Sequence, residues 1–481
     1  MSSQKNHSVF VSGIFNVLHP GHLRFLDFAR RQGDRLFVGV ISNAGVDEKS
    51  ISIEERLRNI KSISYVDEAF AVTGSPAEDI VRLRPDIVVK GWEFRDVENE
   101  EFSAIQSYGG RLIFSPDQSR SSGFSEFSQG GGLASGAISL PHGFMERRDF
   151  GPHDLKEALS GFSKLKVCVV GDIIIDNYIS CSAIGMSRED PTIVIRPEKS
   201  TKFVGGAAVV ASHASSLGAH VSFLSVSGDD GLREFSEKIL IERGIDCHIF
   251  ADDSRPTTEK TRYRCSGKTM LRVNSFGEHS IAKEFQHKIL SKFSQICNDV
   301  DVVIFSDFSY GVLPQELVEE MIGEAASRDV MMVADSQTSS QVGNLGKFSN
   351  VHLVTPTEHE ARITVNDFES GLVALSNKIR SRMNVENVVV TLGEDGLLIT
   401  KSVGHPSDGE FENDRLAAFQ SLPKDPSGAG DAFLSVSSLA LAGGHSIWLA
   451  GCLGALASAI QVSREGNMPI ESREILEILM K

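Results

Sequence analysis

Short apolar runs with strand character alternate with helical patterns along almost the whole chain. For example, Phe25, Phe28 and Ala29 fall on one face of a predicted helix at residues 20–32. Parallel strands need crossover helices of this kind, which cover both faces of a sheet. The alternation therefore predicts an α/β fold. The predicted strands lie at residues 8–13, 35–41, 69–72, 86–89, 165–171, 221–226, 302–306, 330–334 and 388–391, and the first helices at 20–32, 53–63 and 76–83.

The alternation is interrupted once, between residues 119 and 154. This stretch holds three consecutive glycines at 130–132 and several serines, a composition typical of a flexible linker. A chain of 481 residues is also too long for one ordinary core. We therefore predict two doubly wound domains at residues 1–124 and 161–481, joined by a Gly/Ser-rich linker at 125–160.

The charge balance of the chain limits its partners. The formal net charge is -16 and the pI is about 5.4, so the protein has no general attraction to phosphate backbones or anionic membranes. We expect neither nucleic acid nor a membrane as a partner. A local basic pocket for a small phosphate compound is compatible with this balance.

Residues 432–463 contain no Asp, Glu, Lys or Arg, but they are rich in Ala, Gly and Ser. Small residues let helices pack closely, so buried helices fit this stretch better than a membrane span. None of the six cysteines is in a C-x-x-C pair, which favours reduced thiols. The polar start at residues 1–8 lacks the apolar core of a signal peptide. We expect a cytoplasmic protein.

Residues 13–22, with the sequence GIFNVLHPGH, join the first predicted strand to the first predicted helix. A helix start offers unpaired N–H groups and a positive dipole to phosphate. His19 and His22 are three residues apart and share one face of the helix, where they can donate hydrogen bonds to an α-phosphate and to departing pyrophosphate. Two alternative interpretations remain. The two histidines could bind a metal ion, for which no third ligand stands at a convincing spacing, or they could be incidental surface residues.

The same residues resemble the signature of the H-x-G-H nucleotidyltransferases, in the cytidylyltransferase-like group. Over about the first 120 residues the chain is most similar to the nucleotidyltransferase half of the bifunctional heptose-phosphate enzymes. This resemblance implies a Rossmann-like domain that takes ATP or CTP, with His19 and His22 as catalytic residues. The nucleotide-binding residues that it implies are Gly13, Ile14, Phe15, Lys90, Gly91, Arg120, Ser121 and Ser122. Asn16, where the family has Asp, and WEF at 92–94 depart from its pattern and leave the sugar and the base open.

A second motif, DPSGAGDAF at residues 425–433, leads into another predicted helix. Glycines let backbone N–H groups turn toward a ligand, and the helix start adds its positive end. Such a cradle can hold a phosphoryl group in transfer, while Asp431 accepts the proton of the attacking hydroxyl. The alternative interpretation is a glycine turn before a buried helix that an Asp caps.

Residues from about 165 to 470 resemble the ribokinase-like (PfkB) carbohydrate kinases in motif order and spacing. The resemblance implies a ribokinase-like domain with a small β lid, for which residues 179–196 are available, and dimerisation through that lid. It implies Asp431 as the catalytic base, ATP as substrate, and Glu360 as a Mg²⁺ ligand through water. The other implied residues are Asp172, Asp176, Gly205 and Gly206 for the sugar, Gly428, Ala429 and Gly430 for the anion hole, and Thr391, Gly393 and Gly396 for the nucleotide.

Several positions on the substrate side depart from the heptose kinases. Val209 and Thr357 replace Asn, Gln337 stands where Lys is usual, and Tyr310 holds a place often taken by Lys. Three hypotheses follow. The first is a bifunctional enzyme that makes an activated sugar nucleotide from sugar phosphates, with Mg²⁺ and nucleotides. The second is a nucleotidyltransferase with a degenerate kinase domain as scaffold or sensor, and the third is a non-enzymatic, ligand-responsive interaction module. In the bifunctional heptose enzymes the kinase comes first, so the domain order is reversed here.

Overall fold

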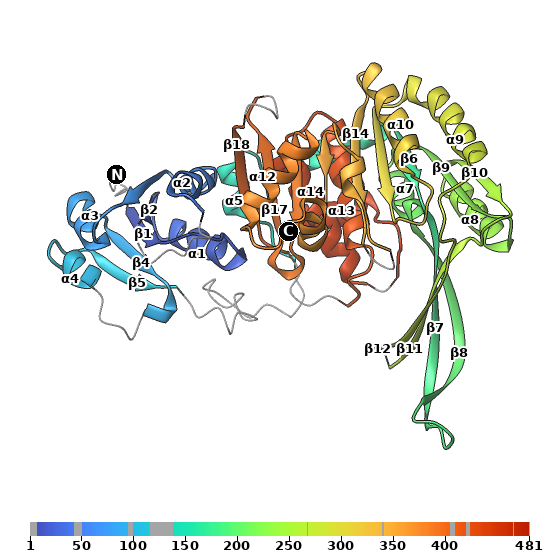
Figure 1. The fold of residues 1–481 in the computed structure, drawn as a ribbon, viewed down its shortest axis with the longest axis horizontal. Coiled ribbons are helices and arrows are strands. Elements are labelled where there is room, and N and C mark those ends of the chain that lie inside the picture. The colour runs from blue at the N-terminus through green and yellow to red at the C-terminus, as the bar shows by residue number, and fades with distance from the viewer. Residues whose placement is uncertain are drawn as a thin grey trace.

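The computed structural model describes residues 7–42, 51–94, 100–115, 138–266, 268–338, 341–404, 409–419, 424–464 and 466–480. Within these residues the strands form three sheets of five, nine and four strands (Figure 1). The first sheet belongs to the N-terminal domain, and the other two belong to the C-terminal domain. The predicted α/β class with two sheet-based domains is confirmed.

The N-terminal domain is a parallel sheet in the order β3-β2-β1-β4-β5. Its central strand is buried because Val9, Phe10 and Val11 have no exposed surface. The predicted strands and helices are confirmed, although the first helix ends at Arg30 instead of residue 32 and the second ends at Lys61 instead of residue 63. The elements are β1 (Ser8–Gly13), α1 (Pro20–Arg30), β2 (Arg35–Ile41), α2 (Ile53–Lys61), β3 (Glu68–Val72), α3 (Pro76–Leu83), β4 (Ile87–Lys90), α4 (Glu100–Gln106) and β5 (Arg111–Phe114).

The nine-stranded sheet runs in the order β10-β9-β6-β13-β14-β15-β16-β17-β18. Its pairs are parallel as far as β16, and β17 and β18 add an antiparallel edge. The strands are β6 (Lys166–Gly171), β9 (His220–Gly228), β10 (Asp246–Asp252), β13 (Val302–Asp307), β14 (Met331–Ser336), β15 (Leu353–Val354), β16 (Asn387–Thr391), β17 (Leu397–Ser402) and β18 (Phe411–Leu416).

Helices cover both faces of this sheet, as a doubly wound fold requires. One apolar cluster contains α9, α10 and α12, and the other contains α7, α13 and α14. The helices are α7 (Ala207–Ser216), α8 (Gly231–Glu242), α9 (Lys283–Ile296), α10 (Gln315–Ser327), α11 (Glu358–Val365), α12 (Leu372–Met383), α13 (Ala429–Ala442), α14 (Ile447–Val462) and α15 (Ser472–Leu479).

The small sheet is a lid in the order β12-β11-β7-β8, and it projects away from the main sheet (Figure 1). The predicted lid segment, residues 179–196, lies in the hairpin of β7 (Ile173–Met186) and β8 (Ile193–Gly206). The other two strands, β11 (Thr258–Cys265) and β12 (Lys268–Ser275), were not predicted. Every side chain of β12 is exposed, so this strand has no apolar alternation to reveal it.

The predicted linker spans residues 125–160, and its second half is not a flexible loop. It forms two helices, α5 (His142–Arg147) and α6 (Pro152–Gly161). Phe144, Met145 and Leu155 are buried in the same apolar cluster as α13 and α14. These helices therefore belong structurally to the C-terminal domain. Residues 116–137, with the three glycines, lie outside the described residues.

The stretch at 432–463 forms α13 and α14, which are buried along most of their length. The prediction of closely packed internal helices is confirmed. Gly454 shows the reason for the small residues, because a Cβ atom there would lie 2.8 Å from the ring of Phe433. Among the described residues, no helix has the length and apolar character needed to cross a membrane.

Candidate active sites

The two histidines of the first motif stack at the start of α1. His19 is the N-cap residue, and Pro20 takes the first helical position, where its missing N–H costs nothing. The ring centroids of His19 and His22 are 4.0 Å apart, and the ring of Phe15 meets His22 edge-on at 5.6 Å. The structure therefore brings both predicted catalytic histidines to one helix start, at the carboxyl end of β1.

Both imidazoles are held in the neutral form. Burial, followed by the neighbouring His19, lowers the pKa of His22 to about 4. Burial and the charge of Arg24 also lower the pKa of His19. Nδ1 of His22 lies 3.0 Å from the carbonyl oxygen of Val17, and because a carbonyl can only accept, Nδ1 carries the proton. Nε2 of His22 can then donate to a phosphate only when the ring gains a second proton.

A buried arginine braces the loop between β1 and α1. Arg56, on α2, is 3% exposed, and its Nη1 donates to the carbonyl oxygens of Ile14 at 2.7 Å and Ile41 at 2.9 Å. The side-chain oxygen of Asn16 accepts from the N–H of Ile51 at 3.0 Å, which gives this departure from the family pattern a structural role. No local sequence pattern marks Arg56, because its partners are backbone atoms.

Lys90 is the last residue of β4, the neighbour of β1 in the sheet, and Gly91 follows it, so both lie at the edge where β1 ends. Nζ of Lys90 forms an ion pair of 2.6 Å with Glu101 and lies 4.9 Å from the ring centroid of Phe94. The predicted nucleotide-binding residues Gly13, Ile14 and Phe15 lie at the same edge, in or directly after β1. The predicted Arg120, Ser121 and Ser122 lie outside the described residues.

The glycine motif of the C-terminal domain leads into α13. Gly428 is the N-cap residue, with φ of 77° in the region that favours glycine. A Cβ atom on Gly430 would meet nothing within 4 Å, so the space in front of this residue is open. The first N–H groups of a helix have no acceptor within it. The N–H groups at the start of α13 are therefore available to an acceptor outside the helix near Gly430, whereas a Cβ atom on Gly428 would lie 2.6 Å from the side-chain oxygen of Asn467.

Asp431 lies in the first turn of α13 and is 5% exposed. Burial, followed by the charge of Asp176, raises the pKa of its carboxyl to about 7, against the opposing effects of Lys260 and Gln337. Nε2 of Gln337 donates a hydrogen bond of 2.8 Å to Oδ1 of Asp431. A carboxyl group with this pKa can take up and release a proton near neutral pH.

Asp176 is the centre of a network next to Asp431. It accepts hydrogen bonds from Nη1 of Arg262, on the lid strand β11, and from Nδ2 of Asn467 at 2.9 Å. Gly205 gives this carboxylate room, since a Cβ atom there would lie 2.3 Å from Oδ2 of Asp176. Gly206 follows with φ of 64° and caps α7. The sequence did not indicate Arg262 or Asn467.

Asp172, the other predicted sugar-binding carboxylate, is directed toward the backbone. Its two oxygens accept from the N–H groups of Phe308, Tyr310 and Val312 at 2.8, 3.4 and 3.1 Å. Burial and the nearby Asp307 raise its pKa to about 6. The structure therefore gives Asp172 a role in holding the loop at 308–312, which places Tyr310 beside the site.

Glu360 is held by the start of its own helix. Thr357 is the N-cap residue of α11, and its N–H and hydroxyl each donate to Oε2 of Glu360 at 2.8 Å. Oε1 accepts from the N–H of Thr338 at 2.6 Å. Thr357 thus replaces the family Asn with a capping box that fixes the carboxylate. Burial, followed by the charges of Glu360 and Asp431, raises the pKa of Asp335 well above its usual value.

Thr391 and Gly393 lie where β16 passes into a short 3₁₀ turn at Gly393–Asp395. Gly396 ends this turn with φ of 89°, and a Cβ atom there would lie 2.0 Å from the carbonyl oxygen of Leu416. Thr391 also bridges to Thr357 at the start of α11. This bridge places Thr391 next to the start of the helix that carries Glu360.

Two family models match this chain. The cytidylyltransferase-like model matches residues 10–109, and the pfkB family carbohydrate kinase model matches residues 164–473. The second match covers more than half of the chain. The chain belongs to the pfkB family of carbohydrate kinases. Its N-terminal domain is cytidylyltransferase-like.

The chain also has curated relatives. The bifunctional protein HldE of Helicobacter hepaticus is 28% identical over 322 residues, which cover 65% of this chain and 64% of that protein. The HldE protein of Desulfatibacillum aliphaticivorans is 30% identical over 66% of this chain and 63% of its own length. The chain therefore matches less than two thirds of the length of each of these two relatives.

Solved structures share the pfkB fold. Phosphofructokinase-2 from Escherichia coli, in complex with substrates and products, matches with a TM-score of 0.55 and 16% identity over 66% of this chain and 98% of its own. Arabidopsis thaliana ribokinase, complexed with ribose and ATP, matches with a TM-score of 0.50 and 17% identity over the same two shares. At this identity the likeness shows the fold alone.

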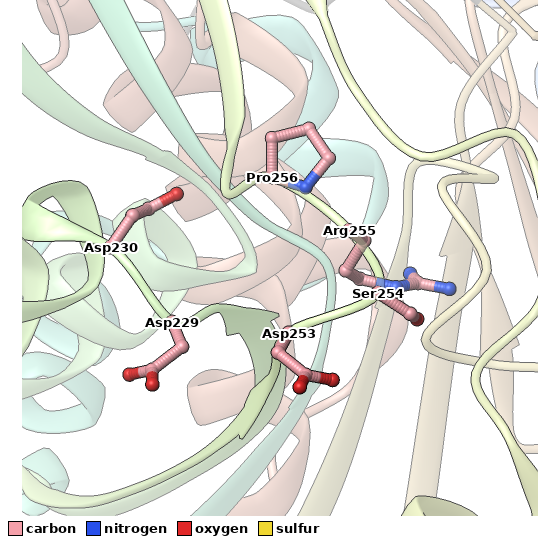
Figure 2. A pocket seen from close by; sticks show the side chains of 6 residues that line it. All are labelled: Asp229, Asp230, Asp253, Ser254, Arg255 and Pro256. Atoms are coloured by element: carbon pink, nitrogen blue, oxygen red, sulfur yellow. The ribbon is translucent and has the colours of Figure 1, made fainter.

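A pocket of about 440 Å³ lies where β9 ends and the chain enters the lid strand β11 of the pfkB domain. Figure 2 shows Asp229, Asp230 and Asp253 around it. Asp230 caps α8 and accepts from the N–H and hydroxyl of Thr257 at 2.9 and 2.7 Å. No predicted site residue lines this pocket. Its carboxylate Asp230 anchors the base of the lid.

Proposed function

We propose that this protein is a bifunctional transferase that makes an activated sugar nucleotide. The observation that carries the proposal is the presence, in one chain, of two separate phosphate-binding helix starts. The histidine pair stands at the start of α1, and Asp431 stands at the start of α13 behind an open glycine turn. Each combines backbone donors with side chains suited to one kind of phosphate chemistry.

In the kinase step, Asp431 accepts the proton of a sugar hydroxyl, whose oxygen attacks the γ-phosphorus of ATP. ADP leaves, and the N–H groups of Ala429 and Gly430 stabilise the charge on the transferred group. Asp176, held by Arg262 and Asn467, orients the sugar. The substrate class is a sugar or a sugar phosphate similar to heptose 7-phosphate.

A bound Mg²⁺ ion would supply positive charge to the nucleotide phosphates in the kinase step. The residues next to the proposed base fit such an ion in their chemistry, because Asp335, Glu360 and Asp431 are buried carboxylates and Mg²⁺ prefers oxygen ligands. Glu360 would hold the ion through water.

In the second step, a phosphate oxygen of a sugar 1-phosphate attacks the α-phosphorus of ATP or CTP, and pyrophosphate leaves. His19 and His22 donate to the oxygens on which charge builds. Gly13, Ile14, Phe15, Lys90 and Gly91 form the edge that faces the nucleotide. Arg120, Ser121 and Ser122 complete the nucleotide site in this proposal.

We also propose a homodimer through the lid in the cytoplasm. Ile184, Met186 and Leu271 on the lid strands are 65%, 61% and 54% exposed, and exposed apolar groups of this kind are typical of interfaces. The six cysteines are free thiols, as expected in a reducing compartment. The variant Leu271→Lys should shift the sedimentation coefficient from dimer to monomer.

The test incubates the protein with Mg²⁺, ATP, CTP and a panel of sugar phosphates, and follows ADP and pyrophosphate separately. We expect both products, with Asp431→Ala abolishing only ADP formation and His19→Ala only pyrophosphate release. Pyrophosphate without ADP would support the degenerate kinase, the alternative that rests on the departures at Val209, Thr357 and Gln337. Neither product from a broad panel would support the non-enzymatic alternative.

A further inference from the structure

The two domains meet along the edge strand β18. Asn413 on this strand has no exposed surface, and its N–H donates to the carbonyl oxygen of Ser62 at 2.7 Å. Its side chain donates to the hydroxyl of Ser62 at 2.8 Å, and its carbonyl oxygen accepts from the N–H of Ser64 at 2.9 Å. Apolar residues of both domains also form one continuous buried cluster. The contact is therefore an ordered interface.

The same interface reaches the loop that carries the histidines. The N–H of Leu372, at the start of α12 in the pfkB domain, donates to the carbonyl oxygen of Leu18 at 2.6 Å. Gly371 makes this approach possible, because a Cβ atom there would lie 2.2 Å from the nitrogen of Leu18. Leu18 directly precedes His19. The pfkB domain thus fixes the backbone next to a proposed catalytic residue.

A second contact joins the nucleotide elements of the two domains. Nη1 of Arg24, on the histidine helix α1, donates to Oδ1 of Asp395 in the turn Gly393–Asp395. Arg415 donates to the carbonyl oxygen of Asp395 at 2.7 Å and fixes the turn from the other side. Arg24 is close enough to His19 for its charge to affect that ring. A carboxylate of the kinase turn therefore holds a cation beside the histidine site.

We propose that Asp395 of the pfkB domain is a positioning residue for nucleotidyl transfer, which acts through Arg24 and couples the two nucleotide sites. This inference rests on the proposed function. A triphosphate at the histidines attracts Arg24, and a nucleotide at the turn 393–396 changes the position of Asp395. Because coupling between two sites is reciprocal, occupation of either site changes the affinity of the other.

The test measures each substitution on the activity of the opposite domain. Asp395→Asn in the full-length protein should raise the KM for the nucleotide in pyrophosphate release by roughly threefold to tenfold, with kcat changed less than twofold. Arg24→Gln should raise the KM for ATP in ADP formation. Arg24→Lys should raise this KM less than Arg24→Gln does. The double variant should be no worse in pyrophosphate release than Arg24→Gln alone.

Two controls match these variants in charge. Glu394→Gln removes a carboxylate from the same turn, and Arg31→Gln removes an arginine from the end of α1 that pairs with Asp27. Each control variant should leave the KM for the nucleotide at the site of the opposite domain unchanged. Equal effects of Asp395→Asn and Glu394→Gln, or no effect of Asp395→Asn, would overturn the coupling.

Failure of the proposed function gives a different result. If the wild-type protein releases no pyrophosphate, the function is wrong, and the coupling is then decided by equilibrium binding of a fluorescent ATP to the same variants. His19→Ala removes the signal of the N-terminal site and identifies it. If Asp395→Asn lowers the affinity of this site and Glu394→Gln does not, the coupling is still supported. If Asp395→Asn leaves the affinity unchanged, the coupling is wrong.

Discussion

Nε2 of Gln337, at the end of β14, donates a hydrogen bond of 2.8 Å to Oδ1 of Asp431, at the start of α13. Gln337 stands where related kinases have Lys, so an uncharged donor replaces an ammonium group beside the proposed base. A hydrogen bond to the carboxylate lowers its pKa, but a full positive charge would lower it further. The balance of burial, Asp176, Lys260 and Gln337 leaves the pKa of Asp431 at about 7.

We therefore expect Gln337→Lys to move the pH profile of ADP formation. The base must be deprotonated, so kcat/KM rises with pH up to its pKa near 7. The added charge favours the carboxylate and should shift the midpoint by about one pH unit to lower pH. Gln337→Leu removes the hydrogen bond and should shift the midpoint to higher pH. Shifts of the same sign in both variants would show that Asp431 does not set the profile.

The raised pKa of Asp431 also has a cost in stability. The folded protein keeps this proton up to about pH 7, whereas the unfolded chain loses it near pH 4. Stability is therefore lost as the pH rises between these two values and stays reduced above pH 7. Asp431→Asn removes the ionisation and should raise the free energy of unfolding at pH 8 by roughly 2–4 kcal/mol.

Urea unfolding at pH 8 and at about pH 3, below the pKa of an Asp side chain in the unfolded protein, measures this difference. At the lower pH the two proteins should be equally stable, because Asp431 is protonated in both states. The variant should form no ADP at any pH. A variant less stable than the wild type at pH 8 would mean that the carboxylate, rather than the neutral acid, is the form that the fold prefers.

Local sequence signals predicted the backbone of the two turns for which we propose phosphate binding. Pro20 and the glycines at 428 and 430 act on their own segments of backbone, so a strand, a turn and a helix start could be recognised without distant contacts. The partners of these turns depend on long-range packing. Asn467 is 291 residues from Asp176, with which it forms a hydrogen bond, and no local pattern marks it.

There are also physical reasons why some elements were not predicted from the sequence. Helix α5 follows a glycine- and serine-rich stretch, and its six residues are too few for a clear helical period. Its arginine side chains become informative only in the fold, where Arg147 pairs with Asp414 at 3.1 Å and lies 5.2 Å from the ring centroid of Tyr65. The interface between the domains was therefore not predictable from the sequence.

Nucleotide binding at the histidine site should take up a proton. Nδ1 of His22 is committed to the carbonyl oxygen of Val17, and the pKa of about 4 leaves Nε2 without a proton at neutral pH. A bound triphosphate raises this pKa, because its negative charge favours the imidazolium form. Calorimetric titration with ATP or CTP in buffers of different ionisation enthalpy should show proton uptake in the wild type and less in His22→Ala. Binding without proton uptake at pH 7 would exclude donation from Nε2 of His22.

The contact between Gly371 and Leu18 predicts the effect of one added methyl group. A Cβ atom at residue 371 would lie 2.2 Å from the nitrogen of Leu18 and 2.7 Å from its carbonyl oxygen, so Gly371→Ala must break the hydrogen bond from Leu372. We expect a loss of about 1–3 kcal/mol in the free energy of unfolding, together with reduced pyrophosphate release. Gly323→Ala is the matched control, because it lies in α10 with nothing within 4 Å of its Cβ position. This second change should stabilise the protein by up to ~1 kcal/mol through helix propensity. Thermal unfolding of both variants measures the contrast, and equal changes of the same sign would show that the two domains do not pack at this point.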